Sequence, residues 1–340
     1  MEAIPARACC KFVGEGRANV VFSITGADGH LNLQGQLLRV PKQTSNAYPY
    51  SRLQQYWETE VLPRFGPQDL VQQRLVRLPS EKAFFERLNQ QLHMLDARGL
   101  RRRDFMGQTV SFHVQYGMLV DDMRAETARH GPSTMHEIKP KWLAQSPRAP
   151  RGAHQCRNCA RELWRNMKNK TRTQVFCPLN LVKAADFPDE DRVAADVGAA
   201  LIRCHNVPEA EARILTAWLR TCTLFKRLRR VQWENDHRAD IKDEGGYCLA
   251  MTLRDCSLFV VAPTKPDVKP HEVVAKLGDM DMKNFAAKKE YWSRMEQEFH
   301  DSGVYWNDTA LARATTDCQL PFYKARRDLS DELRRYYVDT

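Results

Sequence analysis

The 340-residue sequence has no long uninterrupted hydrophobic run. Every apolar stretch falls short of the roughly 18 consecutive apolar residues that a membrane-spanning helix needs. The opening Met-Glu-Ala-Ile-Pro also lacks the basic region and apolar core of a secretory signal. We therefore expect an intracellular protein that has no membrane partner.

Disulfide-framework spacing is also missing, although ten cysteines are present. In a chain of this size they are expected to be mostly reduced thiols. Cys156 and Cys159 form a Cys-x-x-Cys pair, which is half of a zinc site, and His154 and Cys177 could complete it. Neither spacing is that of a standard zinc knuckle or finger. Zinc at Cys156 and Cys159 stays an open alternative, and structural thiols at a helix start are the preferred interpretation.

The sequence has fewer acidic than basic residues. The chain has 52 Lys and Arg against 42 Asp and Glu, a formal net charge of +10, which favours anionic partners. A nucleic-acid partner is not predicted, because neither paired aromatics on strands nor a helix-turn-helix pattern is present. The basic residues form short clusters, which suit the walls of a phosphate pocket as well as ordinary solvated helix faces.

Residues 11–42 predict a strand, turn, strand, turn, strand meander, because β-branched and aromatic runs flank glycine-rich breaks. Gly14 and Gly16 would let a phosphate approach the backbone closely. A Gly-x-Gly alone is more often a plain hairpin turn. Here Arg39 lies on a following strand, and the arrangement resembles the loop that covers the ATP phosphates in protein-kinase-like folds.

The rest of the chain mixes helical and strand patterns. Residues 49–98 and 189–230 show helical periodicity, whereas 117–120 and 135–138 are typical of strands. We expect an α+β protein with a domain boundary after residue 136, giving an N-terminal domain 1–136 and a C-terminal domain 137–340.

Acidic residues follow two further apolar runs. Residues 247–252 and 258–261 predict a hairpin with Asp255 near its turn, and 273–277 predict a strand that leads into Asp279-x-Asp281-x-Lys283. Alternate residues at a strand end share one face, so two carboxylates and an ammonium would gather there. Such a group can hold Mg²⁺ and neutralise a transferring phosphoryl group. A structural, salt-linked strand end is the competing interpretation.

Two lysines flank a proline in the run 137–141. Pro140 fixes its own φ, so Lys139 and Lys141 are expected on a stiff, extended segment and to point the same way. Two such ammonium groups repel each other unless an anion lies between them. A phosphate-rich ligand is the functional hypothesis, and a solvated turn with ordinary surface lysines is the alternative.

Several motifs together resemble the inositol-pentakisphosphate 2-kinase family, in particular its short fungal members. Their order along the chain is that of the family. They are Gly14-Glu15-Gly16-x-Ala18-Asn19, Leu38-Arg39-Val40, Glu137-Ile138-Lys139-Pro140-Lys141, Cys156-x-x-Cys159, Cys177-Pro178-Leu179-Asn180-Leu181, Met251-Thr252-x-x-Asp255-Cys256-Ser257 and Asp279-x-Asp281-x-Lys283.

The resemblance implies a two-lobed inositol-polyphosphate kinase fold, distantly related to protein kinases, with a β-rich N-lobe and a larger, helix-rich C-lobe. It also implies ATP, Mg²⁺ and phosphorylation of the 2-hydroxyl of inositol 1,3,4,5,6-pentakisphosphate to the hexakisphosphate, by a monomer in the nucleus, the cytoplasm or both. Arg165, Asn180 and Asn284 depart from the family pattern, so a catalytically impaired protein that binds inositol polyphosphates is the alternative.

The family's functional residues transfer onto matching positions. For the nucleotide they are Gly14, Gly16, Ala18, Asn19, Arg39, Asp121 and Glu137. For the inositol phosphate they are Lys139, Lys141, Arg165, Lys283 and Tyr291. Asp255 and Arg165 would be catalytic, and Asp279 and Asp255 would bind Mg²⁺. Arg101, Arg102 and Arg103 are candidates for an N-lobe arginine that contacts substrate in the family.

Overall fold

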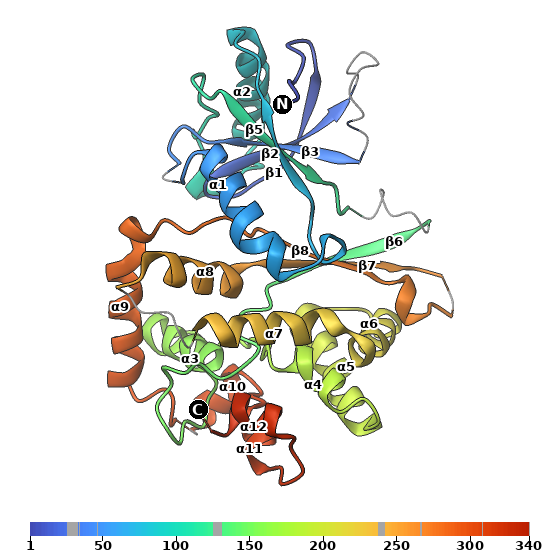
Figure 1. Cartoon of the computed structure of the whole chain (residues 1–340), viewed down its shortest axis with the longest axis vertical. Coiled ribbons are helices and arrows are strands. Elements are labelled where there is room, and N and C mark those ends of the chain that lie inside the picture. Colours follow the sequence, from blue (N-terminus) through green and yellow to red (C-terminus); the bar gives the residue numbers. More distant parts are fainter. Residues whose placement is uncertain are drawn as a thin grey trace. The chain divides into compact units, whose positions relative to one another are not determined.

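The protein is α+β and forms two compact units, Met1–Thr127 and Ala128–Thr340 (Figure 1). The computed structural model describes residues 1–25, 33, 35–45, 47–124, 131–236, 242–265, 267–307 and 309–339. The two units are treated separately below. The turn predicted between the second and third strands lies outside the described residues.

The first unit contains a five-stranded antiparallel sheet in the order β1-β2-β3-β5-β4. Its strands are β1 (Cys9–Glu15), β2 (Asn19–Thr25), β3 (Gln36–Pro41), β4 (Gln73–Arg77) and β5 (Tyr116–Asp121). The predicted meander is confirmed as β1, β2 and β3, and the buried strand predicted at 117–120 is confirmed as β5.

Two α-helices of this unit are α1 (Tyr50–Tyr56) and α2 (Lys82–Ala97). Short helical turns are η1 (Trp57–Val61), η2 (Leu62–Arg64), η3 (Pro67–Asp69) and η4 (Arg103–Phe105). The helical prediction for 49–98 is right for α1 and α2 but wrong for β4. Five residues are too few to show a period, and β4 is defined by its pairing with β5.

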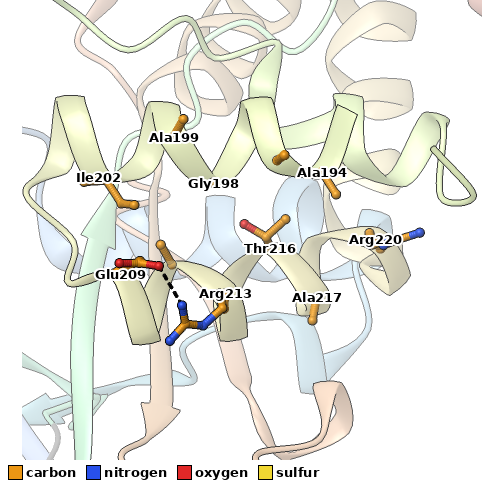
Figure 2. A pocket seen from close by; sticks show the side chains of 11 residues that line it. Ala194, Gly198, Ala199, Ile202, Glu209, Arg213, Thr216, Ala217 and Arg220 are labelled. Carbon is orange, nitrogen blue, oxygen red and sulfur yellow. Dashed lines mark hydrogen bonds and ion pairs between the residues drawn. The ribbon is translucent and has the colours of Figure 1, made fainter. Parts of the chain in front are cut away.

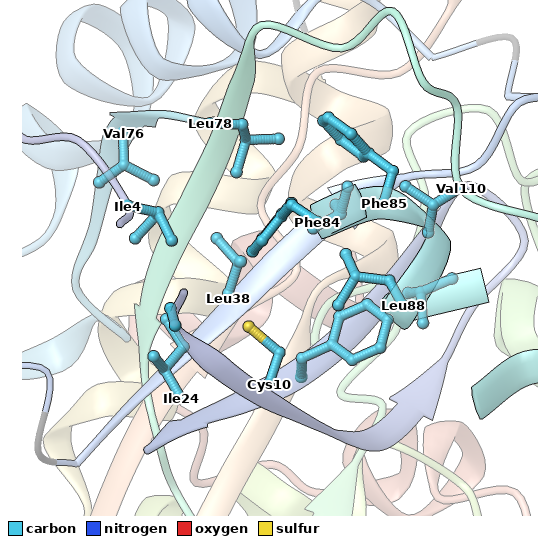
Figure 3. Close-up of a cluster of buried hydrophobic side chains, with 14 of the residues drawn as sticks. Ile4, Cys10, Ile24, Leu38, Val76, Leu78, Phe84, Phe85, Leu88 and Val110 are labelled. Carbon is cyan, nitrogen blue, oxygen red and sulfur yellow. The ribbon is translucent and has the colours of Figure 1, made fainter. Parts of the chain in front are cut away.

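The core of the first unit lies between the sheet and α2. Phe84, Phe85 and Leu88 of α2 pack against strand residues such as Leu38 and Val76, and each is at most 1% exposed (Figure 3). Burying three such side chains contributes on the order of 5–9 kcal/mol before the cost of ordering them. This packing gives the β1–β2 turn a rigid base.

The second unit contains a three-stranded antiparallel sheet, β6-β7-β8. Its strands are β6 (Ser133–Ile138), β7 (Ser257–Pro263) and β8 (Val274–Gly278). Residues 131–136 therefore belong with β7 in this unit, because β6 pairs with β7 and not with the first sheet. The strands predicted at 135–138 and 273–277 are confirmed.

Helices make up most of the second unit. They are α3 (Arg157–Asn169), α4 (Asn180–Asp186), α5 (Asp191–His205), α6 (Glu209–Thr221), α7 (Thr223–Asp236), α8 (Glu244–Asp255), α9 (Phe285–Asp301), α10 (Ala310–Thr315), α11 (Leu320–Ala325), α12 (Asp331–Tyr337) and the short η6 (Pro270–Glu272). The helical prediction for 189–230 is confirmed by α5, α6 and α7. Among the described residues, no helix is long and apolar enough to cross a bilayer.

The predicted hairpin at 247–261 is wrong in its first half, because 247–252 lie in α8. Asp243 caps this helix, and its side chain accepts a hydrogen bond from Gly246 N at 3.2 Å. Seven residues of α8 are buried, so apolar residues lie on nearly every side of the helix. The sequence therefore lacks the alternation of apolar and polar residues that marks an amphipathic helix. A short buried apolar run cannot be assigned to helix or strand by its period alone.

Candidate functional site

Two neighbouring strands bring the run 137–141 beside Asp255. Ile138, the last residue of β6, pairs with Leu258 near the start of β7. The chain that leaves β6 passes through Lys139 to Lys141, and α8 ends at Asp255 just before β7 begins. Side chains more than 110 positions apart in the sequence therefore meet at this end of the sheet.

The site contains an acid–lysine cluster, which consists of Lys139, Lys141, Asp255, Asp279 and Lys283. The Asp255 carboxylate lies 3.0 Å from Lys141 Nζ through Oδ1 and 3.3 Å from Lys283 Nζ through Oδ2. Lys139 Nζ donates to Asp279 Oδ2 at 2.8 Å and to the Asp255 carbonyl at 3.2 Å. All three ammonium groups thus converge on two aspartates, which supply the anion that the lysine pair needs.

The backbone reaches this geometry differently from the sequence prediction. Lys141 has φ of 51° and Asp279 has φ of 56°, so both lie in the left-handed region. The segment around Pro140 is therefore not extended at Lys141, and Asp279 has already left β8, which ends at Gly278. A left-handed residue other than glycine costs about 1–2 kcal/mol, which surrounding contacts must offset.

Neighbouring charges together outweigh burial in setting the pKa values of Asp255 and Lys283. Burial raises the pKa of the Asp255 carboxyl, but Lys283, Lys141 and Lys139 together hold it well below its usual range. Burial lowers the pKa of Lys283, and the surrounding Asp279, Asp255 and Asp281 raise it above its ordinary value. Asp255 is therefore an anion and Lys283 a cation at neutral pH.

The remaining residues predicted in the second unit lie apart from these contacts. Glu137, on β6, accepts a hydrogen bond from Ser257 Oγ at 2.7 Å. Arg165 pairs with Glu162 on its own helix at 3.0 Å, and Tyr291 on α9 is 46% exposed. Within the part of the chain that the structure describes, neither Arg165 nor Tyr291 forms a hydrogen bond or ion pair with the cluster. Both remain predictions.

In the first unit, Gly14 lies near the end of β1, paired with Val21, and Gly16 lies in the turn between β1 and β2. Gly16 N donates to Asn19 O at 2.9 Å and closes the turn. A Cβ atom at either glycine would meet nothing within 4 Å, and neither has a left-handed φ. The space over this turn is therefore open on the protein side, as close approach by a ligand requires.

Asn19, Arg39 and Tyr50 form a small polar group on β2, β3 and α1. The Asn19 amide fits with its oxygen 2.8 Å from an Arg39 guanidinium nitrogen and its nitrogen 2.8 Å from the Tyr50 hydroxyl. Ala18 contributes its carbonyl, which accepts from Lys42 N at 2.8 Å. Asp121, at the end of β5, accepts from Gln72 N at 3.3 Å through its carboxylate. The structure thus joins Asn19 to Arg39, and Asp121 lies elsewhere on the sheet.

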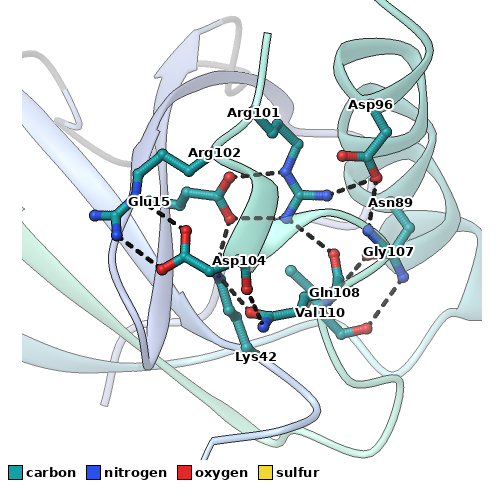
Figure 4. A network of polar contacts seen from close by, with 10 residues as sticks. All are labelled: Glu15, Lys42, Asn89, Asp96, Arg101, Arg102, Asp104, Gly107, Gln108 and Val110. Carbon is teal, nitrogen blue, oxygen red and sulfur yellow. Dashed lines mark hydrogen bonds and ion pairs between the residues drawn. The ribbon is translucent and has the colours of Figure 1, made fainter. Parts of the chain in front are cut away.

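Glu15, between the two glycines, belongs to a buried network of polar contacts (Figure 4). Its carboxylate binds Arg101 at 2.7 Å and Lys42 at 2.7 Å, and all three side chains are at most 6% exposed. Arg101 also binds Asp96 at 2.9 Å. Arg101, a candidate for contact with substrate, is therefore occupied by a buried network. Sequence analysis missed this role for Glu15, although its place in the glycine turn was a signal.

Four buried or half-buried cysteines gather in the second unit. The Sγ atoms of Cys156, Cys159, Cys177 and Cys318 all lie within 4.8 Å of one another. Backbone N–H groups of Cys156 and Gln319 donate to two of these sulfurs, at 3.2 and 3.4 Å. His154 does not belong to the group. Cys318 was missed because it lies far along the chain, with no motif spacing to connect it.

A separate groove of about 450 Å³ runs between α5 and α6 (Figure 2). It is lined largely by small side chains such as Ala194, Gly198 and Ala199, with the Glu209–Arg213 pair at one side. None of the predicted site residues lines it.

Known proteins of one family are similar to this chain over most of its length. The family model described as inositol-pentakisphosphate 2-kinase matches residues 12–298. A protein of that name from Yarrowia lipolytica is 27% identical over 297 residues, covering 85% of this chain and 90% of the relative. One from Eremothecium gossypii is 29% identical over 169 residues, covering 48% of this chain and 52% of the relative.

Proposed function

Since the chain belongs to the inositol-pentakisphosphate 2-kinase family and is a kinase, we propose that it phosphorylates the 2-hydroxyl of inositol 1,3,4,5,6-pentakisphosphate with ATP. The product is inositol hexakisphosphate. One observation carries the proposal: three lysines converge on Asp255 and Asp279, which is the charge arrangement that a phosphorylated alcohol and a transferring phosphoryl group require.

Phosphoryl transfer mainly needs positioning and charge neutralisation. Lys139, Lys141 and Lys283 bind ring phosphates on either side of the reacting hydroxyl and exchange their carboxylate partners for phosphate oxygens. Asp255 then accepts the hydroxyl proton or orients it, because its lowered pKa keeps it ionised. Arg165 and Tyr291 are proposed as further phosphate contacts, on the family resemblance alone.

The donor set also fits a magnesium ion. Mg²⁺ is usually held by one or two carboxylates together with substrate phosphates and water. Asp279 and Asp255 are two half-exposed carboxylates, the first paired with Lys139 and the second with Lys141 and Lys283, so both can turn to a cation when phosphate takes these lysines. Bound there, Mg²⁺ would neutralise charge on the phosphoryl oxygens.

The first unit is proposed as the nucleotide-binding domain, the counterpart of a protein-kinase N-lobe. The open space over Gly14 and Gly16 accommodates phosphate, and Asn19 with Arg39 supplies polar groups on the adjoining strands. Asp121 and Glu137 are proposed to contact the nucleoside. We also propose that the protein acts as a monomer in the nucleus, the cytoplasm or both.

The direct test is turnover. The purified protein is incubated with Mg-ATP and inositol pentakisphosphate, and the products are separated by anion exchange. We expect hexakisphosphate, with Asp279→Asn as a variant that loses activity and Asp301→Asn, at the end of α9, as a matched control. Protein that binds ATP but yields no product contradicts the proposal.

The alternative is a kinase-fold protein that binds inositol polyphosphates without turnover. The departures at Arg165, Asn180 and Asn284 favour it. Calorimetry with the hexakisphosphate separates the two, because a non-catalytic binder gives heat without product in the turnover assay.

We further propose that Cys156, Cys159, Cys177 and Cys318 hold a structural zinc ion. Four thiolates at about 2.3 Å from a tetrahedral zinc lie roughly 3.8 Å apart, and Cys156 Sγ lies 4.0 Å from Cys177 Sγ. The ion would tie the start of α3 to the segments before α4 and α11, and so stabilise the helices of the second unit.

Elemental analysis of the purified protein is expected to give about one zinc per chain. Cys318→Ser should lower both the zinc content and the melting temperature, because metal binding contributes directly to folding. Cys10→Ser, at a buried cysteine in the first unit, is the control and should keep the zinc. Protein that folds without bound zinc contradicts this assignment.

A further inference from the structure

Gln232 is a buried amide on α7 that connects two segments of the candidate site. Its side chain is 3% exposed. Nε2 donates to the Lys141 carbonyl at 2.6 Å and to the Leu253 carbonyl at 2.9 Å, while Oε1 accepts from Leu143 N at 3.0 Å. Both N–H groups and the carbonyl oxygen of this one side chain are therefore used.

The backbone groups that Gln232 binds lie where regular secondary structure ends or is absent. Lys141 has a left-handed φ of 51°, a conformation that persists only where the surroundings fix it. The bonds of Gln232 hold the peptide groups on both sides of Trp142, directly after Lys141. Leu253 lies in the last turn of α8, where helix carbonyls have no partner within the helix, and its carbonyl accepts from Cys256 Sγ at 3.3 Å as well as from Gln232.

The same two segments meet a second time through their central residues. The Arg254 guanidinium lies over the Trp142 ring, 3.6 Å from its centroid, and also pairs with Asp236 of α7. Residues 141–143 and 253–255 thus contact each other, and both segments are bound by side chains of α7. Their outer ends carry Lys141 and Asp255, whose charged atoms are 3.0 Å apart.

We propose that Gln232 is a positioning residue that fixes Lys141 and Asp255 at the spacing that phosphoryl transfer needs. The inference rests on the proposed function and assigns α7 a role in it. Gln232 does not touch substrate. It acts through the backbone of the lysine that binds a phosphate and through the helix end that carries the catalytic carboxylate.

Two substitutions test the role. Gln232→Met keeps the approximate volume but removes all three hydrogen bonds, and Gln232→Glu keeps the acceptor for Leu143 N but loses both donors. We expect kcat for hexakisphosphate formation to fall about 10-fold to 100-fold in each, as for small displacements of reacting groups. The KM for ATP should change less than about 2-fold.

Gln319→Met is the matched control. Gln319 is also a buried glutamine, 6% exposed, whose amide binds Lys183 Nζ and the Asp317 carbonyl rather than the site. Its loss should lower stability while leaving kcat within about 2-fold. Equal loss of kcat in Gln319→Met and Gln232→Met, or failure of both Gln232 variants to fold, would overturn the positioning role.

A double-mutant cycle with Lys141→Ala gives a readout that a purely structural role would not move. If Gln232 acts partly through Lys141, then Gln232→Met should lower kcat by a smaller factor in the Lys141→Ala background than in the parent protein. Full additivity contradicts the inference. Activity of the unmodified protein distinguishes the cases: its absence refutes the proposed function, whereas an active protein with a fully active Gln232→Met refutes the positioning role alone.

Discussion

At the scale of single residues, the site depends on Asp255 more than on any one lysine. Its carboxylate binds Lys141 and Lys283, and its carbonyl accepts from Lys139. The charges explain why an aspartate that is 49% exposed still has a pKa well below its usual range. The three cations keep Asp255 ionised but weaken it as a base, so its proton affinity should rise when phosphate oxygens replace it as partner of the lysines.

Asp255→Asn should therefore lower kcat by about 100-fold or more, because the carboxylate that is proposed to orient the hydroxyl or take its proton is lost. Affinity for inositol hexakisphosphate should stay the same or increase, since a negative charge leaves the phosphate site. Turnover is measured by anion exchange and affinity by calorimetry. If both fall together, Asp255 supports structure rather than catalysis.

Glu15 should make the folding stability of the first unit depend on pH. Burial raises the pKa of its carboxyl, but Arg101 and Lys42 lower it below its ordinary value. The folded chain then holds fewer protons at this group than the unfolded chain. The resulting stability is present above about pH 4.3 and is lost as the pH falls below that value.

Glu15→Gln should reduce the unfolding free energy of the first unit by about 3 kcal/mol at pH 7, since Arg101 loses its buried partner. The difference in unfolding free energy between the variant and the parent should be smaller at pH 4 than at pH 7. Urea denaturation at the two pH values measures it. Glu86→Gln, at an exposed α2 ion pair, is the control and should change stability by less than about 0.5 kcal/mol. A gap that is independent of pH would contradict the assignment.

At the scale of elements, α8 shows how a helix can replace an expected strand. Its N-terminus starts at the Asp243 cap and its C-terminus presents Asp255 beside β7. The residues between them are buried on most sides of the helix, so their sequence does not show an amphipathic pattern. The position of Asp255 therefore depends on a helix end, and the geometry of that end determines where the carboxylate lies.

Asp243→Ala should destabilise the second unit by about 1 kcal/mol, because the Gly246 N–H loses its side-chain acceptor. Thermal or urea denaturation gives the change. Ser330→Ala, which removes the corresponding cap of α12, is expected to cost a similar amount but to leave kcat unchanged. If Asp243→Ala has no effect on stability, the capping bond does not hold in solution.

At the scale of the whole molecule, a net charge of +10 creates a field that attracts polyanions. The acid–lysine cluster lies within the second unit, whereas the glycine turn lies within the first. Each unit builds its own part from strands and helices that pack locally. The field and the cluster together predict strongly salt-dependent binding.

Affinity for inositol hexakisphosphate should fall by about 10-fold or more between roughly 50 and 300 mM salt. Replacing Lys139 and Lys141 with methionine should make this dependence shallower, because two of the responsible charges are removed. Lys82→Met, at an exposed lysine of α2 in the first unit, is the control. Calorimetry across a salt series is the measurement, and a slope that the Lys139 and Lys141 substitutions leave unchanged contradicts the role of the cluster.

The sequence by itself determined the ordered motifs, the three strands around Gly14 and Gly16, and the residue types of the site. These follow from local patterns, since turns, alternation and charged runs are properties of neighbouring residues. The family assignment rests on the same information.

Only the tertiary structure decided which of these residues meet. Pairing of β6 with β7 and the end of α8 bring Lys141 to Asp255, and Gln232 of α7 binds the carbonyl of Lys141, whose φ is left-handed. Cys318 joins Cys156 across 162 positions in the same way. Such contacts have no local pattern because they arise from the packing of distant elements, whose free energy depends on the whole fold and not on the spacing of residues in the chain.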